Sequence, residues 1–278
     1  MMKTRSIVQK PLIALIIIIV TLLILFPLYW MLSTSLKYES EVFRLPPTLF
    51  PDTITTENFV FAWTETSMPL YFMNSGIYVL GTLLVVLFCA SLASYSISRF
   101  KFKGKAVFLL LVLLTQLMPI TTLIVPLFIS LGNLDMMNSR FSMIVIYAAI
   151  QIPIAIWLLL GYFNSIPGDI DEAARIDGCS NLAILFRIIL PLAKPGLMAV
   201  SLTITIFVWQ DLILAMTFTS IDSLRPVMAG VSASIQRAGI KWGQMTATGV
   251  LACIPIIILY IFLQRNLVEG LTGGAVKG

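Results

Sequence analysis

The sequence PGDIDEAARIDGCSNLAILFRIILPLAKP, residues 167–195, decides how the rest of the chain is interpreted. Asp169 and Glu172 have the three-residue spacing of a capping box, in which two side chains satisfy free backbone groups at a helix start. Both acids, together with Asp171, also place negative charge where a helix N-terminus is electropositive. A short helix of about seven residues is therefore expected over residues 170–177.

A second helix is expected to follow after a tight turn. Asp177-Gly178 supplies a residue that adopts positive φ without strain, and Ser180 can cap the next helix. That helix should end at Leu190, because the residue before Pro191 is disfavoured in the α conformation. Its apolar residues have helical spacing, so it is predicted to lie against the rest of the protein while the first helix projects. These apolar residues are Leu182, Leu185, Phe186, Ile189 and Leu190.

The predicted first helix is too short to be stable by itself, since about 12 residues are needed for marginal stability in water. Something else must therefore hold it. Ala173 and Ala174 offer a small surface that another body can approach closely. From the residues alone, the alternative is an interfacial loop helix with solvated charges.

Composition places this stretch in a membrane protein. Of the 278 residues, 59% are hydrophobic and 11% are charged, and the mean hydropathy is +0.98. In a soluble domain about a quarter of the residues are charged. No histidine is present, which removes the commonest general base and metal ligand. The cysteines are far apart and indicate neither a disulfide framework nor a zinc cluster; they are Cys89, Cys179 and Cys253.

Six apolar segments are long enough to cross a membrane. The first is longer than the apolar region of a signal peptide, about 7 to 15 residues, and lacks a small-x-small cleavage site, so it is expected to be retained. The predicted spans are residues 11–32, 72–97, 106–131, 140–163, 196–218 and 245–263, followed by a tail, residues 264–278.

The distribution of positive charge predicts the orientation of these spans. When residues 167–195 and both termini are placed inside, 12 Lys and Arg residues lie inside and 6 lie outside, which accounts for all 18. This asymmetry follows the positive-inside rule, so both termini and the loop of residues 167–195 are predicted to be cytoplasmic. The net charge of +5 therefore needs no nucleic-acid partner to explain it.

The second and third spans carry signals for packing and bending. Ala90, Ser94 and Ser98 recur every four residues and would let another helix pack closely. Pro119 and Pro126 remove backbone donors and are expected to kink the third span. Such irregular backbone is tolerated in a membrane only where protein or a water-lined cavity covers it.

Polar positions inside the spans are candidates for a solute path. Gln116 precedes the first of these prolines, although a structural kink satisfied by neighbouring helices would also explain it. In Trp209-Gln210-Asp211, the acid lies roughly 22 Å from the cytoplasmic end. A carboxylate at the centre of a span costs about 2.5 to 3.5 kcal/mol, so it usually has a partner or a role. The three side chains suit a hydroxyl-rich solute; subunit packing or a hydrogen bond within the protein is the alternative.

The segments between the spans are expected to be less ordered. Residues 33–69 are predicted to form an external loop with some local structure, and residues 220–244 an exposed outer loop. Asn74-Ser75 at the start of the second span has two interpretations: a simple polar helix end, or a match to the family named below. Residues 270–278 are glycine-rich and cannot form a core, which favours a disordered tail.

Several of these strings resemble one family. Glu172-Ala173-Ala174, Asp177-Gly178 and Ile188-Ile189-Leu190-Pro191-Leu192 resemble the EAA signature of permease subunits of ABC importers, with Cys179 where alanine is more usual. Trp209-Gln210-Asp211 resembles the Trp-Asn-Asp/Glu motif of sugar permeases, with Gln210 in place of asparagine. The glycine-rich ending also resembles that of carbohydrate permeases. The resemblance covers nearly the whole chain and is most specific at residues 167–195.

The resemblance implies an all-α polytopic membrane protein with six transmembrane helices and a cytoplasmic coupling helix, the type I ABC importer permease fold. The chain would be a maltose-type permease subunit for carbohydrate uptake in a bacterial or archaeal inner membrane. Its implied partners are two copies of an ABC ATPase, a second homologous permease, an extracytoplasmic solute-binding protein and a sugar-like substrate.

The resemblance also implies roles for individual residues. The coupling helix would dock into a cleft on the ATPase through Glu172, Ala173, Ala174, Arg175, Asp177 and Gly178, supported by Ile189 and Pro191. The solute path would involve Asp211, Gln210, Trp209 and Gln116. The tail would contact the ATPase through Gly273, Gly274 and Lys277.

The sequence contains no GxxxxGK[ST] string, so a Walker-type phosphate loop is absent, and ATP with its magnesium would be bound by the partner ATPase. The chain itself is expected to be non-catalytic and to hold no cofactor. The alternative function is that of an ion-coupled secondary transporter of a small polar solute, which would usually carry several intramembrane carboxylates or two repeated halves. An intramembrane enzyme would need paired acids, a Ser-His or Ser-Lys pair, or metal ligands. One clear intramembrane acid, Asp211, argues against both classes.

Overall fold

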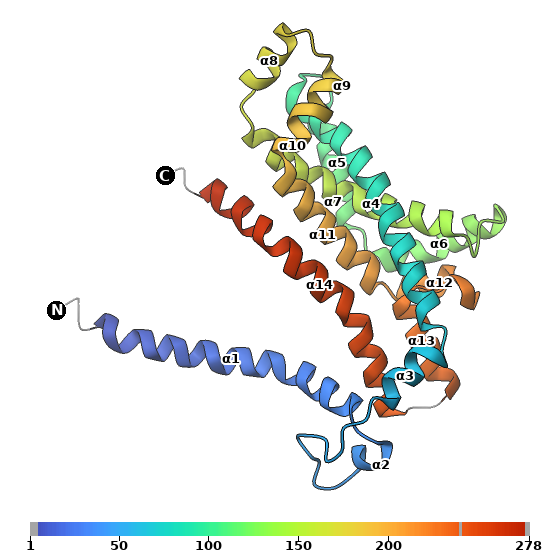
Figure 1. Cartoon of the computed structure of the whole chain (residues 1–278). Coiled ribbons are helices and arrows are strands. Elements are labelled where there is room, and N and C mark those ends of the chain that lie inside the picture. Colours follow the sequence, from blue (N-terminus) through green and yellow to red (C-terminus); the bar gives the residue numbers. More distant parts are fainter. Residues whose placement is uncertain (1–4, 239–240, 276–278) are drawn as a thin grey trace. The chain divides into compact units, whose positions relative to one another are not determined.

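The structure is a computed structural model that describes residues 5–238 and 241–275. Every regular element in this part of the chain is helical (Figure 1). The longer helices are α1 Arg5–Ser35, α3 Glu57–Thr64, α4 Met68–Arg99, α5 Lys105–Leu117, α6 Ile120–Asn133, α7 Arg140–Ser165, α8 Asp169–Ile176, α11 Lys194–Gln210, α13 Val227–Ala238 and α14 Trp242–Ala275. The shorter elements are α2 Glu39–Val42, α9 Asn181–Ile184, the π-helical turn η1 Leu185–Ile189, α10 Leu190–Leu192, α12 Ile213–Phe218 and the 3₁₀ turn η2 Asp222–Leu224.

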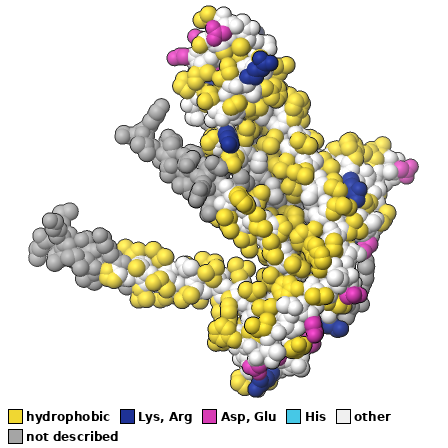
Figure 2. Space-filling view, in the orientation of Figure 1, with side chains coloured by type: hydrophobic (Ala, Val, Ile, Leu, Met, Phe, Trp, Pro, Cys, Tyr) yellow, Lys and Arg dark blue, Asp and Glu magenta, His cyan; other side chains and the backbone are white. Residues whose placement is uncertain are grey.

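The chain divides into two compact units, each considered by itself. Unit 1 consists of Met1–Met68 with Val231–Ile254, and unit 2 of Pro69–Gly230 with Pro255–Gly278. In Figure 2, hydrophobic side chains cover α1, whereas charged side chains gather around α8 at the top of the view. This distribution agrees with an apolar span in α1 and a water-exposed end at α8.

Four helices are long and apolar enough to cross a membrane, and they contain Ile13–Ser35, Met68–Arg99, Arg140–Ser165 and Trp242–Phe262. Two further helix pairs qualify only as bent spans. The angle is 94° between α5 and α6, and 80° between Asn181–Leu192 and α11. The described residues therefore hold four spans, or six if each bent pair is one span. The second pair includes residues 181–192, which were predicted to lie in the loop before the fifth span.

Helix α7 lies at the centre of unit 2. Its most apolar stretch is 50% buried, against 33% or less in the other three long helices. It packs against α5 and α11. The ring of Tyr147 contacts Tyr78 of α4 and Phe207 of α11 edge-on, with centroids 6.3 and 6.2 Å apart, a geometry that aromatic pairs prefer. The core of unit 2 is therefore built around α7.

The predicted close packing along α4 is confirmed. Ala90 and Ser94 are completely buried. Ser94 Oγ donates to the carbonyl oxygen of Ile156 in α7 at 3.0 Å, and Ser98 Oγ donates to Asn164 Oδ1 at 2.7 Å. Small side chains thus bring α4 and α7 close enough for hydrogen bonds between the two helices.

The third predicted span is broken, which is a larger change than a kink. Helix α5 ends at Leu117, and α6 begins at Ile120 after a sharp turn (Figure 1). Pro119 is extended, with ψ 126°, and cannot donate a backbone hydrogen bond, so it separates the two helices. Helix α6 continues through Pro126, and Ser130 Oγ donates to the Pro126 carbonyl oxygen at 2.8 Å.

The fifth predicted span, residues 196–218, is also interrupted. Helix α11 ends at Gln210, Asp211 is extended with ψ 127°, and α12 begins at Ile213. Residues 196–218 therefore contain two helices and not one continuous helix. The physical reason is that the Asp211 carboxylate accepts the backbone N–H groups of Leu214 and Ala215, at 3.4 and 2.9 Å, and so caps α12.

The segment that follows α12 is attached to α4. Asn74 is completely buried, and its Nδ2 donates to the carbonyl oxygens of Ser223 and Arg225 at 2.9 and 3.1 Å. Its Oδ1 accepts a hydrogen bond from Arg140 Nη2 at 3.0 Å. Asn74 therefore uses both ends of its amide in the core and is more than a polar helix end.

Ser75 and Tyr78 complete this attachment. We call the set of Asn74, Ser75, Tyr78 and the backbone groups that they bind the outer clasp. The Tyr78 hydroxyl donates to the carbonyl oxygen of Leu224 at 2.7 Å, and Ser75 Oγ accepts the backbone N–H of Val227 at 2.8 Å. The prediction of an exposed loop is therefore wrong for this part of residues 220–244, which also includes η2 and α13.

The segment of residues 35–58 in unit 1 has local structure, as predicted for residues 33–69. Asn58 of α3 donates from Nδ2 to the carbonyl oxygens of Ser35 and Lys37 at 3.0 and 2.9 Å. The backbone N–H of Thr55 donates to the carbonyl oxygen of Leu36 at 3.0 Å. These bonds fix the start and the end of this segment to each other.

The last helix is longer than the sequence predicts. The expected sixth span, residues 245–263, lies within α14, which continues to Ala275. Gly273 and Gly274 are part of this helix, so the disorder expected from residue 270 onward is wrong as far as residue 275. Lys277 lies outside the described residues.

Two glycines offer a matched test of the packing around α7. A methyl group on Gly196 would lie 2.4 Å from Tyr162 Cγ, whereas nothing lies within 4 Å of one on Gly161. We expect Gly196→Ala to destabilise the chain by about 1 to 3 kcal/mol through overpacking. Gly161→Ala should leave stability unchanged or slightly higher. Thermal unfolding of both purified variants in detergent measures the difference, and equal midpoints would contradict the close approach of α11 to Tyr162.

Candidate coupling and transport sites

The loop of residues 167–195 contains the predicted helix and glycine turn. Helix α8 runs over Asp169–Ile176, and Gly178 has φ +82°, as predicted for the residue after it. The backbone N–H of Cys179 donates to the carbonyl oxygen of Ala174 at 2.9 Å, which closes the end of the helix. Ser180 Oγ accepts the N–H of Ala183 at 3.3 Å, so the predicted cap of the next helix is confirmed.

The start of α8 differs from the prediction. Gly168 is the residue before the helix, and no side chain caps it, so the capping box of Asp169 and Glu172 is absent. Asp169 is the first helical residue, which puts its carboxylate one position too far along to act as a cap. The three acids still lie in the first turn, where the helix dipole favours negative charge.

Asp171 has a role that the sequence prediction missed. Its carboxylate is 2% exposed, and Oδ2 lies 2.9 Å from Arg99 Nε at the end of α4. The Tyr95 hydroxyl donates to Asp171 Oδ1 at 3.0 Å, and Arg99 Nη2 donates to the carbonyl oxygen of Ile166 at 3.0 Å. In the sequence, Arg99 contributed only to the count of positive charges that predicts orientation, and no spacing connects it to residue 171.

The burial of Asp171 determines which side of α8 is free. Ala174, one turn later, is 5% exposed and faces inward, so it does not form an outer surface together with Ala173 as predicted. The free side, which we call the coupling face, carries an apolar side chain that the prediction did not include, Ile176, which is 86% exposed. The coupling face consists of Glu172, Ala173, Arg175, Ile176 and Asp177.

The second half of the loop is more irregular than predicted. The helix does not end at Leu190, because a π-helical turn, η1, carries it into α10 with Pro191 in its first turn. The N–H of Leu190 donates to the carbonyl oxygen of Leu185, five residues back, and this wider turn makes room for the proline ring. Leu185 and Ile189 are completely buried, as predicted, but Leu182 and Phe186 are exposed.

The break at Asp211 is held by several bonds to one carboxylate. Besides the two backbone N–H groups of α12, the Tyr147 hydroxyl of α7 donates to Asp211 Oδ2 at 2.9 Å. Gln210 beside it is exposed. Trp209 is buried and its ring meets Phe72 edge-on, with centroids 5.7 Å apart. Of these three predicted path residues, Asp211 caps α12, Trp209 packs against Phe72 and Gln210 is exposed.

Gln116 lies in a different place. It lines a cavity of about 550 Å³ in unit 2, bounded mainly by α5, α6 and α7 and by Phe207 of α11. Its Nε2 donates to the carbonyl oxygen of Ile150 at 3.4 Å. The cavity is large enough for a small solute, but its lining is mostly apolar, and Trp209, Gln210 and Asp211 are not part of it. The predicted path residues therefore do not form one site in this structure.

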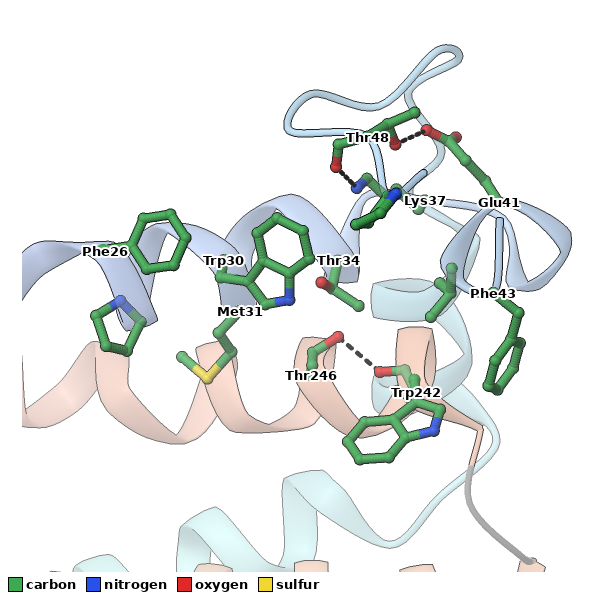
Figure 3. Close-up of a pocket in the computed structure, with 13 residues that line it drawn as sticks. Phe26, Trp30, Met31, Thr34, Lys37, Glu41, Phe43, Thr48, Trp242 and Thr246 are labelled. Atoms are coloured by element: carbon green, nitrogen blue, oxygen red, sulfur yellow. Dashed lines mark hydrogen bonds between the residues drawn. The ribbon is translucent and has the colours of Figure 1, made fainter. Parts of the chain in front are cut away.

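A second recess, of about 620 Å³, lies in unit 1 between the end of α1 and the start of α14 (Figure 3). Lys37 is 3% exposed; its Nζ donates to the carbonyl oxygen of Thr48 and lies 5.1 Å from the centre of the Trp30 ring. Thr48 Oγ1 donates to Glu41 Oε1 at 2.7 Å, and this bond is the main cause that lowers the pKa of the Glu41 carboxyl. These polar groups are engaged with one another, so the recess offers mainly aromatic and apolar surface.

The described residues contain no group of three or more His, Cys, Asp or Glu side chains that could hold a metal ion. Cys89, Cys179 and Cys253 are free thiols.

Comparison with known proteins identifies the family. The family described as the inner membrane component of binding-protein-dependent transport systems matches residues 86–273. The sulfoquinovosyl glycerol transport system permease protein of Agrobacterium fabrum is 33% identical over 254 residues, covering 91% of this chain and 89% of that protein. The trehalose/maltose transport system permease protein of Thermococcus litoralis is 33% identical over 264 residues, covering 94% of each.

The fold is shared with a solved structure as well. A chain of a bacterial ABC transporter involved in the import of the acidic polysaccharide alginate superposes with a TM-score of 0.85 at 22% identity, covering 95% of this chain and 98% of that one. The predicted all-α polytopic fold is therefore confirmed. With a family match over residues 86–273 and relatives alike along nearly its whole length, this chain belongs to the inner membrane components of binding-protein-dependent transport systems and is an ABC importer permease subunit with the type I fold.

Proposed function

We propose that this chain is the membrane-spanning permease subunit of an ATP-driven importer that moves a sugar or sugar-like solute into the cell. The two relatives described above are named for sulfoquinovosyl glycerol and for trehalose or maltose. These solutes differ in size and charge but share a hydroxyl-rich glycosidic chemistry. They support that class of solute for this chain.

The observation that carries the coupling part of the proposal is the coupling face of α8. Asp171 and Ala174 hold one side of this helix against unit 2, so Glu172, Ala173 and Ile176 remain free for a second protein. The chain has no Walker-type string, so ATP hydrolysis belongs to a separate subunit. We infer that a cytoplasmic ATPase docks on this face and on Gly178, supported from behind by Ile189 and Pro191.

The full importer would contain two ATPase copies, a second homologous permease and an extracytoplasmic solute-binding protein. Both termini of this chain would be cytoplasmic, as the excess of Lys and Arg on that side indicates. The end of the chain, including Gly273, Gly274 and Lys277, would then be on the same side as the ATPase and could contact it.

Transport would proceed by alternating access, in which closure of the ATPases moves α8 and the helix bundle rocks around a central path. The breaks at Pro119 and Asp211 are positions where the packing of unit 2 can be rearranged without unwinding a continuous helix. Gln116, Trp209, Gln210 and Asp211 remain the candidates for the path, with Gln116 already beside a cavity.

The alternative, an ion-coupled secondary transporter, has less support. Such a carrier needs an intramembrane acid that is free to bind and release its ion. The carboxylate of Asp211 already accepts three hydrogen bonds, from Tyr147, Leu214 and Ala215. Its geometry therefore fits a helix cap better than an ion site.

Uptake by proteoliposomes that contain the assembled importer tests the proposal. A panel of labelled sugars should be taken up only when ATP, the ATPase subunit and the solute-binding protein are all present. Omission of the ATPase should abolish uptake even with an imposed proton or sodium gradient. Uptake driven by such a gradient without the ATPase would overturn the proposal in favour of the secondary transporter.

The turn after α8 provides a matched pair of variants. Nothing lies within 4 Å of a Cβ on either Gly178 or Gly168, but only Gly178 has positive φ, at +82°. A β-branched residue in this region costs more than about 1 to 2 kcal/mol, so Gly178→Val should weaken ATPase binding about tenfold and reduce uptake in proportion. Gly168→Val, in the same loop, should bind normally. Titration of the ATPase onto the purified permeases measures both affinities, and equal values would remove the turn from the coupling role.

The carboxylate of Asp211 can be tested against one of its donors. Asp211→Asn keeps the shape of the side chain but replaces an accepting oxygen by an amide that faces donors, whereas Tyr147→Phe removes only one hydrogen bond. We expect Asp211→Asn to lower uptake, or to shift its sugar preference, by about tenfold, with a smaller effect for Tyr147→Phe. The readouts are KM and maximal rate across the sugar panel. Unchanged kinetics in Asp211→Asn would leave this residue a scaffold role only.

A further inference from the structure

Helix α8 needs to be held in place, because its eight residues are fewer than the roughly 12 that give marginal stability in water. The chain itself ties α8 to α7, since only residues 166–168 lie between the two helices. It provides no such tie to α4, whose last residue, Arg99, is far away in the sequence. The link between α8 and α4 must therefore come from side chains.

That link is a buried ion pair with a supporting hydroxyl. The Arg99 side chain is 10% exposed and that of Asp171 is 2% exposed, with Nε and Oδ2 2.9 Å apart. The Tyr95 hydroxyl, one turn earlier in α4, donates to the other carboxylate oxygen at 3.0 Å. Water competes little for such a pair, and removing either partner leaves a buried charge uncompensated. Breaking this contact is therefore more costly than breaking an exposed ion pair.

Arg99 also reaches a third helix. Its Nη2 donates at 3.0 Å to the carbonyl oxygen of Ile166, the residue directly after α7, where the helix dipole favours a cation. The nearest cation on α8, Arg175, is exposed and lies 3.4 Å from Asn181, so it does not take part in this contact. A single guanidinium group thus joins α4, α7 and α8.

We propose that Arg99, assisted by Tyr95, is a positioning residue that makes α8 and the neighbouring ends of α4 and α7 move as one body, with Asp171 as its anchor. This inference rests on the proposed function, in which a partner moves α8 through the coupling face. A displacement of α8 is then passed to α4 directly through side chains, and not only to α7 through the connecting residues. Since α4 is packed along α7 by Ser94 and Ser98, both helices receive the motion together.

Charge-removing variants in the assembled importer test the functional consequence. With the ATPase at saturating concentration, Arg99→Gln and Asp171→Asn should still hydrolyse ATP, while the amount of sugar imported per ATP falls about tenfold or more, as expected when charged hydrogen bonds are lost. Two exposed neighbours serve as matched controls: Lys103→Gln in the loop after α4 and Asp169→Asn in the first turn of α8. Both controls should keep the wild-type ratio. The exchanged pair, Arg99→Asp with Asp171→Arg, should recover part of it.

A distance measurement tests the rigid connection without relying on activity. Spin labels would be placed at two exposed positions outside the coupling face, Ser96→Cys on α4 and Asp169→Cys on α8, after the three native cysteines are replaced by serine. In the otherwise unchanged importer, the distance between the labels should be the same with and without ATP. The Asp171→Asn change should broaden the distribution or make it depend on nucleotide. A distance that shifts with ATP while Arg99 and Asp171 are intact would overturn the inference, even if the charge variants fail to assemble.

The two experiments also separate this inference from the proposed function. If the unmodified importer takes up sugar without its ATPase, the proposed function fails. If uptake depends on ATP but Arg99→Gln keeps the wild-type import ratio, the coupling proposal stands and only the role of Arg99 is rejected.

Discussion

The contact between Asp171 and Arg99 is the interaction on which the arrangement of the coupling loop depends. An eight-residue helix has no fixed direction of its own, so the side chain that is buried determines the side that is presented. With Asp171 and Ala174 turned inward, the helical period places Glu172, Ala173 and Ile176 outward. Glu172 is thus exposed because the acid immediately before it, Asp171, is buried. One ion pair inside the chain therefore determines which side chains of α8 are exposed.

A second constraint acts within the spans, where backbone groups cannot be left to water. The chain is broken at Pro119 and at Asp211, and in both places a polar side chain lies at the break. Asp211 supplies oxygens to two N–H groups of α12, and Gln116 reaches the carbonyl oxygen of Ile150 in α7. In this structure, Asp211 and Gln116 therefore form hydrogen bonds with backbone groups. Their use for a solute requires a state of the bundle in which these bonds are exchanged.

Sequence reasoning succeeded where the cause is local and failed where a distant residue decides. The positive φ of Gly178, the cap at Ser180 and the small residues along α4 follow from neighbours in the chain, and all three are confirmed. The pairing of Asp171 with Arg99 could not be predicted, because it joins residues whose proximity exists only after α4 and α7 have packed. The prediction of a capping box was wrong because the spacing of Asp169 and Glu172 fits two arrangements. Asp169 can precede the helix as its cap, or it can be the first helical residue, as it is in the structure. At Asp211, the cost of a buried carboxylate correctly indicated a partner, but its partners were backbone groups of its own chain.

The outer clasp has a consequence for how this family can diversify. Asn74 and Tyr78 donate to the main-chain carbonyl oxygens of Ser223, Leu224 and Arg225, and Ser75 accepts a main-chain N–H. Contacts of this kind depend on the backbone conformation of residues 223 to 227 and not on which side chains these residues carry. Residues 223 to 225 can therefore drift in sequence while the segment stays seated on α4. The surface of this segment can therefore change by substitution while the helix beneath it stays the same.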